Sequence, residues 1–290
     1  MRTCAFLTMD TLDDFVCDDE LAVEPLGALG WEVDFVSWHR RDANWDRYDA
    51  VIIRSTWDYQ QSPAAFLSVL ESIEQSTARL ENPLSLVRWN LRKTYLRDLE
   101  DRGIAIVPTR WCEGVDVGQI STLFDQFNVD EIVLKPVVGA NADHAFRLHR
   151  QRFEDRLEEL SRSYRDTQYL AQPFIDSVIA EGEYSLFYFA GELSHAILKT
   201  PRESDFRVQE EHGGLIRPVA QPVPPLAVAG RQAMAALPVV PLYGRVDLVR
   251  GPSDVFQVME LELIEPALYF RMNPGSPRRF ADALDRWFRK

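Results

Sequence analysis

The first 80 residues alternate between short apolar runs and polar segments with helical spacing. Apolar runs at 4–9, 32–38 and 49–56 are each long enough for one strand, and residues 62–75 repeat apolar side chains at helical intervals. A polar, acidic segment separates the first two runs. The order of strand, helix, strand, strand and helix predicts a small doubly wound α/β domain.

The pattern changes near Pro83, and the remainder predicts α+β structure rather than a second doubly wound sheet. We expect, in chain order, a helix at 90–103, a strand at 104–109, a strand–turn–strand unit at 130–149, a charged helix at 150–166, an extended run at 168–175, a hairpin around Ala190-Gly191 and an antiparallel pair joined at Gly251-Pro252. The last helix carries Phe280, Leu284, Trp287 and Phe288 at core spacing.

Composition and charge exclude several classes of protein. The 290 residues are 46% hydrophobic, which is enough for a buried core. No apolar run approaches the roughly 18 residues that span a bilayer, and the amino terminus shows no cleavage signature. A net charge of −13 argues against binding to nucleic-acid backbones, and three cysteines without a CxxC pair fit a reducing compartment. We therefore expect a cytoplasmic protein with neither a membrane nor a nucleic-acid partner.

Two glutamates lie in the apolar run near residue 260, where a strand is expected. Glu260 and Glu262 are two positions apart, so both side chains point to one face of that strand. Like charges placed in this way repel each other unless a positive group lies over them. With Asp247 from the neighbouring strand they would form an oxygen cage of the kind that holds Mg²⁺ beside nucleotide phosphates. The alternative is a solvated sheet face covered by arginines such as Arg245.

A lysine near the end of another apolar strand indicates an anion nearby. Lys135 follows the run "IVL", and burial of a lysine without a partner is costly. The loop that follows contains Gly139 and small residues, which allow backbone N–H groups to approach phosphate oxygens.

The order of these motifs resembles an ATP-grasp enzyme of the glutathione-synthetase-like group, over residues 82 to 274. The motifs are "NLRK" with Asn90 and Lys93, "LKP" with Lys135, the loop from Gly139 to His144, the segment "QPFI", and Asp247 followed by Glu260, Glu262 and Pro266. Glu262 stands where that family usually has asparagine, and the loop has fewer glycines than is usual. The resemblance implies an N-terminal α/β substrate-side domain at 1–84, a central subdomain with the phosphate loop at 85–172 and a C-terminal subdomain with the metal site at 173–290.

The resemblance also implies ATP and Mg²⁺ as cofactors, with two ions expected. It places Lys93, Lys135, Gly139, Asn141 and Lys199 near the phosphates, the backbone of Gln172, Phe174 and Ile175 at the adenine, and Glu181 or Glu183 at the ribose. Asp247, Glu260 and Glu262 are implied as metal ligands. Catalysis in this family is ligation: a carboxylate becomes an acylphosphate, and a nitrogen then displaces phosphate. Arg207 and Arg245 are expected beside the acylphosphate, because the planar guanidinium group pairs with phosphate through two hydrogen bonds.

Within the superfamily, the segments "RSTWDY", "GEYSLFYFAGELSHAILK", "FRVQEEHGG" and "ELELIEPALYF" are most similar to the small group that includes cycloserine synthetase. That enzyme closes O-ureido-serine onto its own carboxylate, so a small amino-acid-like substrate is implied here. The first domain would then bind substrate through the exits of its strands, where Asp10 and "RSTWDY" lie. Asp58 or Glu265 suits an amino group and Arg54 or Arg245 suits a carboxylate, with Ser55 beside them.

Several alternatives stay open at this stage. A phosphotransferase on the same fold would retain the nucleotide residues, a nucleotide-binding regulator would lack the carboxylates, and a glutamate ligase would modify a protein or peptide. A homodimer is also left open. The acidic run from Asp10 to Glu20 is expected to be a solvated helix face. His195 lies within an apolar strand, where a hydrogen-bonded structural role is expected.

Overall fold

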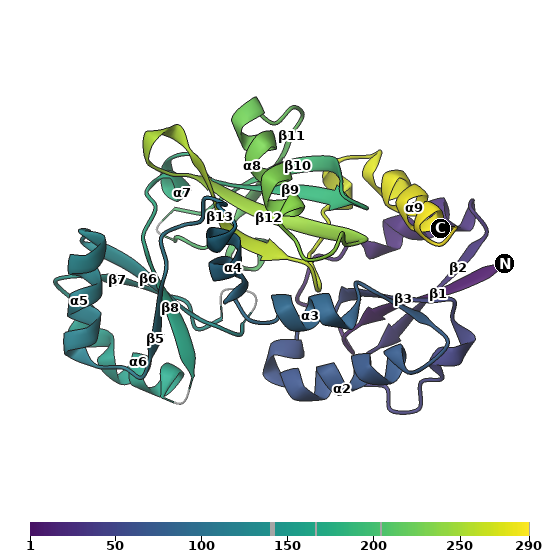
Figure 1. Ribbon diagram of the computed structural model, residues 1–290, viewed down its shortest axis with the longest axis horizontal. Coiled ribbons are helices and arrows are strands. Elements are labelled where there is room, and N and C mark those ends of the chain that lie inside the picture. The colour runs from purple at the N-terminus through teal and green to yellow at the C-terminus, as the bar shows by residue number, and fades with distance from the viewer. Residues whose placement is uncertain (140–142, 166, 204, 290) are drawn as a thin grey trace.

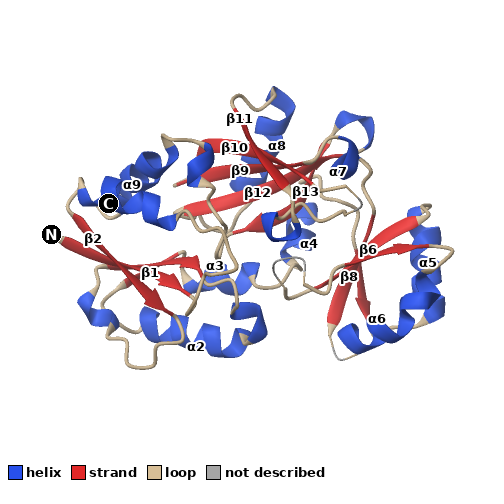
Figure 2. Cartoon of the chain, turned by 180° about the vertical axis from the view of Figure 1, so that it is seen from behind, coloured by secondary structure: helices blue, strands red, loops and turns tan. Residues whose placement is uncertain are grey.

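The computed structural model describes residues 1–139, 143–165, 167–203 and 205–289. In this part of the chain the strands form three sheets, one of five strands and two of four. The five-stranded sheet lies between the other two, which are on either side of it (Figures 1 and 2). None of the described helices combines the length and the apolar character needed to cross a membrane.

The N-terminal sheet is parallel, with the order β2-β1-β3-β4. Its strands are β1 (Arg2–Thr8), β2 (Trp31–Ser37), β3 (Ala50–Ser55) and β4 (Arg79–Glu81). Every residue of β3 is buried, as is usual for a parallel strand covered on both faces. The doubly wound domain predicted from the sequence is therefore confirmed.

Helices from both ends of the chain cover this sheet. One face packs on α2 (Pro63–Glu74), and the other packs on α1 (Val23–Gly27) and the C-terminal helix α9 (Ser276–Trp287). The two faces are separated by the alternation of β3, with Val51 and Ile53 on the α2 side and Ile52 on the α9 side. Helix α9 thus returns to the N-terminal sheet, across the domain boundary expected near residue 84 (Figure 1).

The central sheet is antiparallel, with the order β5-β8-β6-β7. Its elements are β5 (Arg110–Glu113), α5 (Val117–Phe127), β6 (Glu131–Pro136), β7 (Phe146–His149), α6 (Leu157–Tyr164) and β8 (Gln168–Pro173). Helices α5 and α6 cover one face, against which Ile132 and Leu134 of β6 pack. Because side chains alternate along a strand, Val133 and Lys135 point away from this core.

The five-stranded sheet is antiparallel, with the order β11-β10-β9-β12-β13. Its strands are β9 (Glu183–Phe189), β10 (Glu192–Thr200), β11 (Leu215–Val219), β12 (Tyr243–Arg250) and β13 (Phe256–Glu262). Helices α3 (Leu84–Asn90) and α4 (Tyr95–Asp101) precede the central sheet in the chain, whereas α7 (Ser177–Ala180) precedes β9 and α8 (Pro224–Ala235) lies between β11 and β12. Both hairpins expected from the sequence, at Ala190-Gly191 and Gly251-Pro252, are present.

The structure corrects three local predictions. Residues 104–109 form no strand but a single bridge between Ile106 and Val258, because the segment crosses β13 only briefly before Pro108. The helix expected at 90–103 begins at Tyr95, after a turn that contains Lys93. The acidic run from Asp10 to Glu20 is largely exposed, as expected, but residues 10–18 form turns rather than a helix, and Asp19 is buried against Arg54.

Candidate active site

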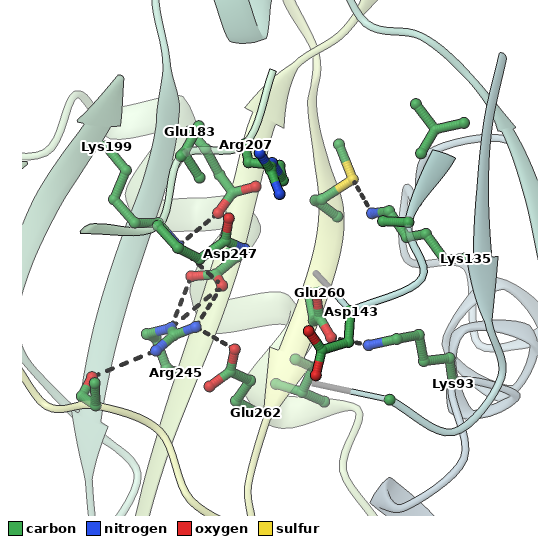
Figure 3. A pocket seen from close by; sticks show the side chains of 18 of the residues that line it. Lys93, Lys135, Asp143, Glu183, Lys199, Arg207, Arg245, Asp247, Glu260 and Glu262 are labelled. Carbon is green, nitrogen blue, oxygen red and sulfur yellow. Dashed lines mark hydrogen bonds and ion pairs between the residues drawn. The ribbon is translucent and has the colours of Figure 1, made fainter. Parts of the chain in front are cut away.

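One cavity is lined by residues from all three sheets and from the connections between them. The five-stranded sheet contributes β9, β10, β12 and β13, the central sheet contributes β6 and the end of β8, and the N-terminal sheet contributes the segment after β3. Figure 3 shows the charged side chains that converge on the cavity from these elements. The motifs that resemble the ATP-grasp family therefore meet in one place.

The register of β12 and β13 aligns the acidic residues. Asp247 lies opposite Glu260, and Arg245 lies opposite Glu262. Side chains that are opposite in an antiparallel pair share a face of the sheet. The expectation that Asp247, Glu260 and Glu262 converge from neighbouring strands is confirmed.

The positive charge over these carboxylates comes from the chain itself. Lys93 forms an ion pair with Glu260, and Arg245 forms one with Glu262 (Figure 3). Arg245 also donates from Nε to Asp247 Oδ1 and from Nη2 to Asp247 Oδ2, each at 3.0 Å. Pairing with lysine and arginine thus offsets the repulsion that two glutamates on one strand face would produce.

The predicted metal cage is not assembled from these side chains. In the parts of the chain that the structure describes, no group of three or more His, Cys, Asp or Glu side chains is placed to hold a metal ion. Asp247 is 2% exposed, and Arg245, Lys199 and Ser185 all bond to its oxygens. Glu260 and Glu262 keep about a quarter of their side-chain surface exposed, with 26% for each. They are the carboxylates whose donor chemistry and access fit a Mg²⁺ ion shared with phosphate oxygens, since such ions need only one or two protein carboxylates.

Burial and neighbouring charges shift the pKa values of these groups in opposite directions. Burial, with the charges of Asp247 and Glu260 added to it, raises the pKa of Glu262 to about 7 against the effect of Arg245. Burial also opposes ionisation of Glu260, but Lys93 and Lys135 outweigh it, so the pKa of Glu260 is lowered. Burial lowers the pKa of Lys135, and the charge of Glu260 only partly restores it. Among the described side chains, Lys135 has no carboxylate in ion-pair contact, and its Nζ lies 3.4 Å from Met259 Sδ.

A second ion-pair group lies on β9 and β10. Lys199 Nζ lies 2.6 Å from Glu183 and 3.3 Å from Asp247, and all three are buried. Burial raises the pKa of Glu183 although Lys199 acts to lower it. Glu181, the other residue proposed for the ribose, does not line the cavity and is paired with Arg250 at 2.8 Å. Of the two alternatives, only Glu183 faces the cavity.

The segment "QPFI" forms one wall of the cavity. Gln172, Phe174 and Ile175 all line it. The Phe174 N–H donates to the carbonyl of Glu131 at 3.0 Å. The guanidinium group of Arg147 lies over the Phe174 ring, 3.6 Å from the ring centroid. Gln172 is held by a hydrogen bond from Nε2 to Thr109 Oγ1 at 3.1 Å. These contacts fix the backbone of the segment at the end of β8.

The loop after Lys135 reaches the cavity at both of its described ends. Gly139 and Asp143 line the cavity, while Asn141 lies outside the described residues. A Cβ atom on Gly139 would lie 2.8 Å from Pro136 Cγ, so a larger residue would displace the turn. Asp143 was not among the residues singled out from the sequence.

Arg207 lies in the connection between β10 and β11 and lines the cavity. Asp205 binds its guanidinium through two hydrogen bonds, from Nε at 3.1 Å and from Nη2 at 2.9 Å. Arg271 contacts the same connection through an ion pair with Glu210, and it also forms an ion pair with Asp18 at 2.7 Å. Sequence reasoning missed Arg271, because its two partners are distant along the chain.

The structure corrects most of the substrate residues predicted in the first domain. Arg54 is fully buried and donates to Asp19 at 2.9 Å and to the carbonyl of Pro266 at 2.9 Å, so it is a structural ion pair. Ser55 is also fully buried, bonded to Thr8. Asp10 accepts from Ser37 at 2.5 Å, and Asp58 accepts from Trp38 and His39. Neither of these aspartates lines the cavity.

Other residues from the same segments do line the cavity. Trp57 and Tyr59, which follow β3, lie in its wall together with Glu265 and Tyr269. The Trp57 indole N–H donates to the carbonyl of Glu265 at 2.8 Å. The motif "RSTWDY" thus reaches the cavity through its two aromatic residues rather than through its charged ones.

His195 has the structural role expected from the sequence. Its Nε2 lies 2.9 Å from the carbonyl oxygen of Leu268, and its ring stacks on Phe187 with centroids 4.2 Å apart. Burial lowers its pKa to about 4. The histidine is therefore neutral and does not belong to the group of charged residues in the cavity.

Comparison with known proteins identifies the family of this chain. Residues 4–82 match the family described as the N-terminal domain of D-cycloserine synthetase DcsG. The cycloserine biosynthesis protein DcsG of Streptomyces lavendulae is 32% identical over 276 residues, which cover 90% of this chain and 91% of that protein. The chain belongs to the DcsG family. As a DcsG-family protein with this site it is an ATP-dependent ligase of the ATP-grasp type.

Solved structures agree with this assignment. The crystal structure of D-cycloserine synthetase DcsG superimposes with a TM-score of 0.87 at 28% identity, covering 98% of this chain and 99% of that one. The ATP-grasp ligase PsnB in complex with a minimal precursor has a TM-score of 0.66 at 19% identity, covering 98% of each chain. A RimK domain protein from Sphaerobacter thermophilus has a TM-score of 0.71 at 14% identity, covering 99% of each. The last two share the fold with the DcsG family.

Proposed function

We propose that this ligase activates the carboxylate of a small amino-acid-like molecule as an acylphosphate and joins it to a nitrogen. The observation that supports this most directly is the meeting of Lys93, Lys135, Lys199 and Arg245 with the aligned carboxylates of β12 and β13 in one cavity. Transfer of a phosphoryl group to a carboxylate needs cations that offset charge in the transition state, and it needs no protein nucleophile. The cavity meets the first requirement from four separate elements.

The nucleotide has a suitable position against the central sheet. Phe174, Ile175, Val178 and Met259 offer an apolar wall, which suits the adenine ring. Lys135 projects from the same sheet without a carboxylate partner among the described side chains, so a phosphate oxygen would supply an anion. Glu183 faces the cavity where a ribose hydroxyl would lie, which supports it over Glu181.

Glu260 and Glu262 would hold Mg²⁺ together with phosphate oxygens. When bound, the ion offsets the charge on the transferring phosphoryl group. The phosphates would then compete with Glu260 for the ammonium group of Lys93. Arg245 remains hydrogen-bonded to Asp247 through Nε and Nη2 and ion-paired with Glu262. These contacts fix the position of its positive charge in the site.

Arg207 is the proposed cation beside the acylphosphate. Its guanidinium is one-third exposed and is already oriented by Asp205, which leaves the remaining N–H groups for a ligand. The pKa of Arg207 is raised by its hydrogen bonds to Asp205, so it stays charged throughout the working range. The DcsG relatives are named as cycloserine enzymes, and we propose by extension that carboxylate and nitrogen belong to one molecule, which the reaction cyclises.

The test is a phosphate-release screen with ATP, Mg²⁺ and a panel of amino acids and amino-acid ureas, followed by mass measurement of the product. The proposal expects ADP and free phosphate in equal amounts and a product that is lighter than the substrate by the atoms lost on ring closure. ADP without free phosphate would indicate a phosphotransferase. A product containing two substrate residues would replace cyclisation by intermolecular ligation, and mass addition to a peptide would indicate a glutamate-ligase activity.

A further inference from the structure

One buried carboxyl group in the cavity differs from the others that the structure describes. The buried carboxylates Glu183 and Asp247 and the partly exposed Glu260 and Glu262 each form an ion pair with a lysine or arginine nitrogen. Glu265 is 6% exposed and lines the same cavity, yet among the described residues it has no such partner. The hydroxyl of Tyr59 is within hydrogen-bonding reach of its carboxyl group.

The surroundings do not supply the missing charge. Lys93 and Arg245 are close enough to act on Glu265 electrostatically, but they are already paired with Glu260 and with Asp247. Burial, with the charge of Glu262 added to it, raises the pKa of Glu265 to about 8. A carboxyl group in this state gains most from a cation that arrives from outside the protein.

The backbone that carries Glu265 is fixed by the first domain. The Trp57 indole donates to the carbonyl of Glu265 at 2.8 Å, and Arg54 Nη2 donates to the carbonyl of Pro266 at 2.9 Å. Both residues belong to "RSTWDY", the motif that follows and includes the end of β3. Two hydrogen bonds to consecutive carbonyls hold the backbone of Glu265 in place before a ligand binds, which contributes to a preorganised binding site.

Aromatic residues line the cavity near Glu265. Trp57 and Tyr59 line the cavity beside it, and the ring of Phe15 packs on Trp57 with centroids 5.2 Å apart. The faces of such rings attract cations, tryptophan most strongly. A carboxyl group that has no cation of its own and shares its cavity with aromatic side chains is the chemistry that recognises an ammonium group.

The position along the cavity also fits a second reactant. Phe174 and Ile175 follow β8 of the central sheet, whereas Trp57 and Tyr59 follow β3 of the N-terminal sheet, and these sheets lie on opposite sides of the five-stranded sheet (Figures 1 and 2). A nucleotide seated against the central sheet leaves the Glu265 end free. The charged residues of β12 and β13 lie between the two ends, where transfer from one ligand to the other would occur.

We propose that Glu265, Tyr59 and Trp57 bind the ammonium group of the amino-acid substrate and so determine its specificity for a free amine. This inference rests on the proposed function, because it assigns one end of that substrate. It gives the motif "RSTWDY" a role that differs from the one expected from sequence: Arg54 and Trp57 position the glutamate, and Tyr59 completes its hydrogen bonding.

The test compares each amino acid of the panel with its N-acetyl derivative, which has no ammonium group. Binding is measured by titration calorimetry in the presence of the ATP analogue AMPPNP, for the wild type and for Glu265→Gln. A charged hydrogen-bonded contact of this kind corresponds to a preference on the order of 10- to 100-fold. We expect the wild type to prefer the free amine by that factor, and Glu265→Gln to lower the preference to about threefold or less while AMPPNP affinity is unchanged.

The matched control is Asp58→Asn, an acid-to-amide change beside Tyr59 in the sequence. Asp58 bonds to Trp38 and His39 and lies outside the cavity wall, so its variant should retain the wild-type preference. If Glu265→Gln does not fold, Tyr59→Phe is measured in its place. Its preference for the free amine over the N-acetyl derivative should be about threefold to tenfold lower than that of the wild type. An unchanged preference in both cavity variants overturns the proposal, as does an equal loss in Asp58→Asn.

The two proposals fail in different ways. If no member of the panel supports ADP formation by the wild type, the proposed ligase function on amino acids is wrong. Calorimetry would still measure whether the cavity prefers a free amine and so would still test the ammonium site. If ADP forms but free and N-acetylated amino acids bind equally well to the wild type, the ammonium site is wrong and the ligase function stands.

Discussion

Replacement of Arg54 by methionine separates a structural role from a substrate-binding one. Arg54 is fully buried, with Nε and Nη2 donating to Asp19 Oδ1 at 3.1 and 2.9 Å and Nη2 also donating to the carbonyl of Pro266. Arg54→Met would leave Asp19, which is 3% exposed, as a buried carboxylate without its cation. Removal of one partner from a buried ion pair costs about 3–5 kcal/mol of unfolding free energy.

The measurement is urea unfolding followed by tryptophan fluorescence, with the slope of the transition checked for change. The control is Arg47→Met, because the Arg47–Asp34 pair is exposed and should contribute about 0–1 kcal/mol. The double variant Arg54→Met with Asp19→Asn should recover at least about 2 kcal/mol, since it removes the stranded charge. A loss below about 1 kcal/mol for Arg54→Met would refute the assignment of Arg54 to a structural ion pair.

Three further predictions concern catalysis, pH and the connection that carries Arg207. Glu260→Gln should lower the rate of ADP formation by about two to three orders of magnitude with an unchanged circular dichroism spectrum; a rate within about threefold of the wild type would remove Glu260 from catalysis. The folded pKa of His195, about 4, lies below its unfolded value of 6.5, so stability should fall by about 3 kcal/mol as pH drops from 6.5 to 4. His195→Gln should flatten that fall in acid unfolding curves, and an equally steep fall would contradict the assignment. Arg271→Ala should raise the KM of the amino-acid substrate about tenfold, because Arg271 forms ion pairs with both Glu210 and Asp18 and so positions the connection. Arg271→Lys should partly restore the KM. Kinetics of Arg271→Ala within about twofold of the wild type would show that this contact does not position the connection.

Local periodicity determined much of the architecture. The alternation of apolar residues predicted the parallel strands of the first domain, and turn residues at Ala190-Gly191 and Gly251-Pro252 predicted the two hairpins. Because a strand has a period of two, Glu260 and Glu262 had to share a face. Asp247 lies opposite Glu260 only because the register shifts between Asp247 and Leu248, since the unshifted pairing would have placed it opposite Met259. The shared face of the two glutamates is therefore readable from spacing, and the position of Asp247 is not.

The partners of the charged residues were decided by the tertiary structure. The sequence alone did not show whether metal or arginine would lie over Glu260 and Glu262, since Lys93 reaches Glu260 from 167 positions away. For the same reason the sequence suggested that Arg54 binds the substrate, although its guanidinium group donates to Asp19 and to the carbonyl of Pro266. Spacing within a strand or helix carries no record of such distant pairs.

What the sequence by itself determined is most of the elements, their order and which side chains within one strand share a face, because these follow from backbone geometry over a few residues. The tertiary structure decided which of the described charges are neutralised within the protein and which are left for a ligand. Glu265 shows the difference: it follows Glu262 by only three positions, and only the packing of the first domain against the segment after β13 leaves it buried without a cation among the described residues. Contacts between positions more than 200 residues apart produce that result, and local sequence patterns do not encode them.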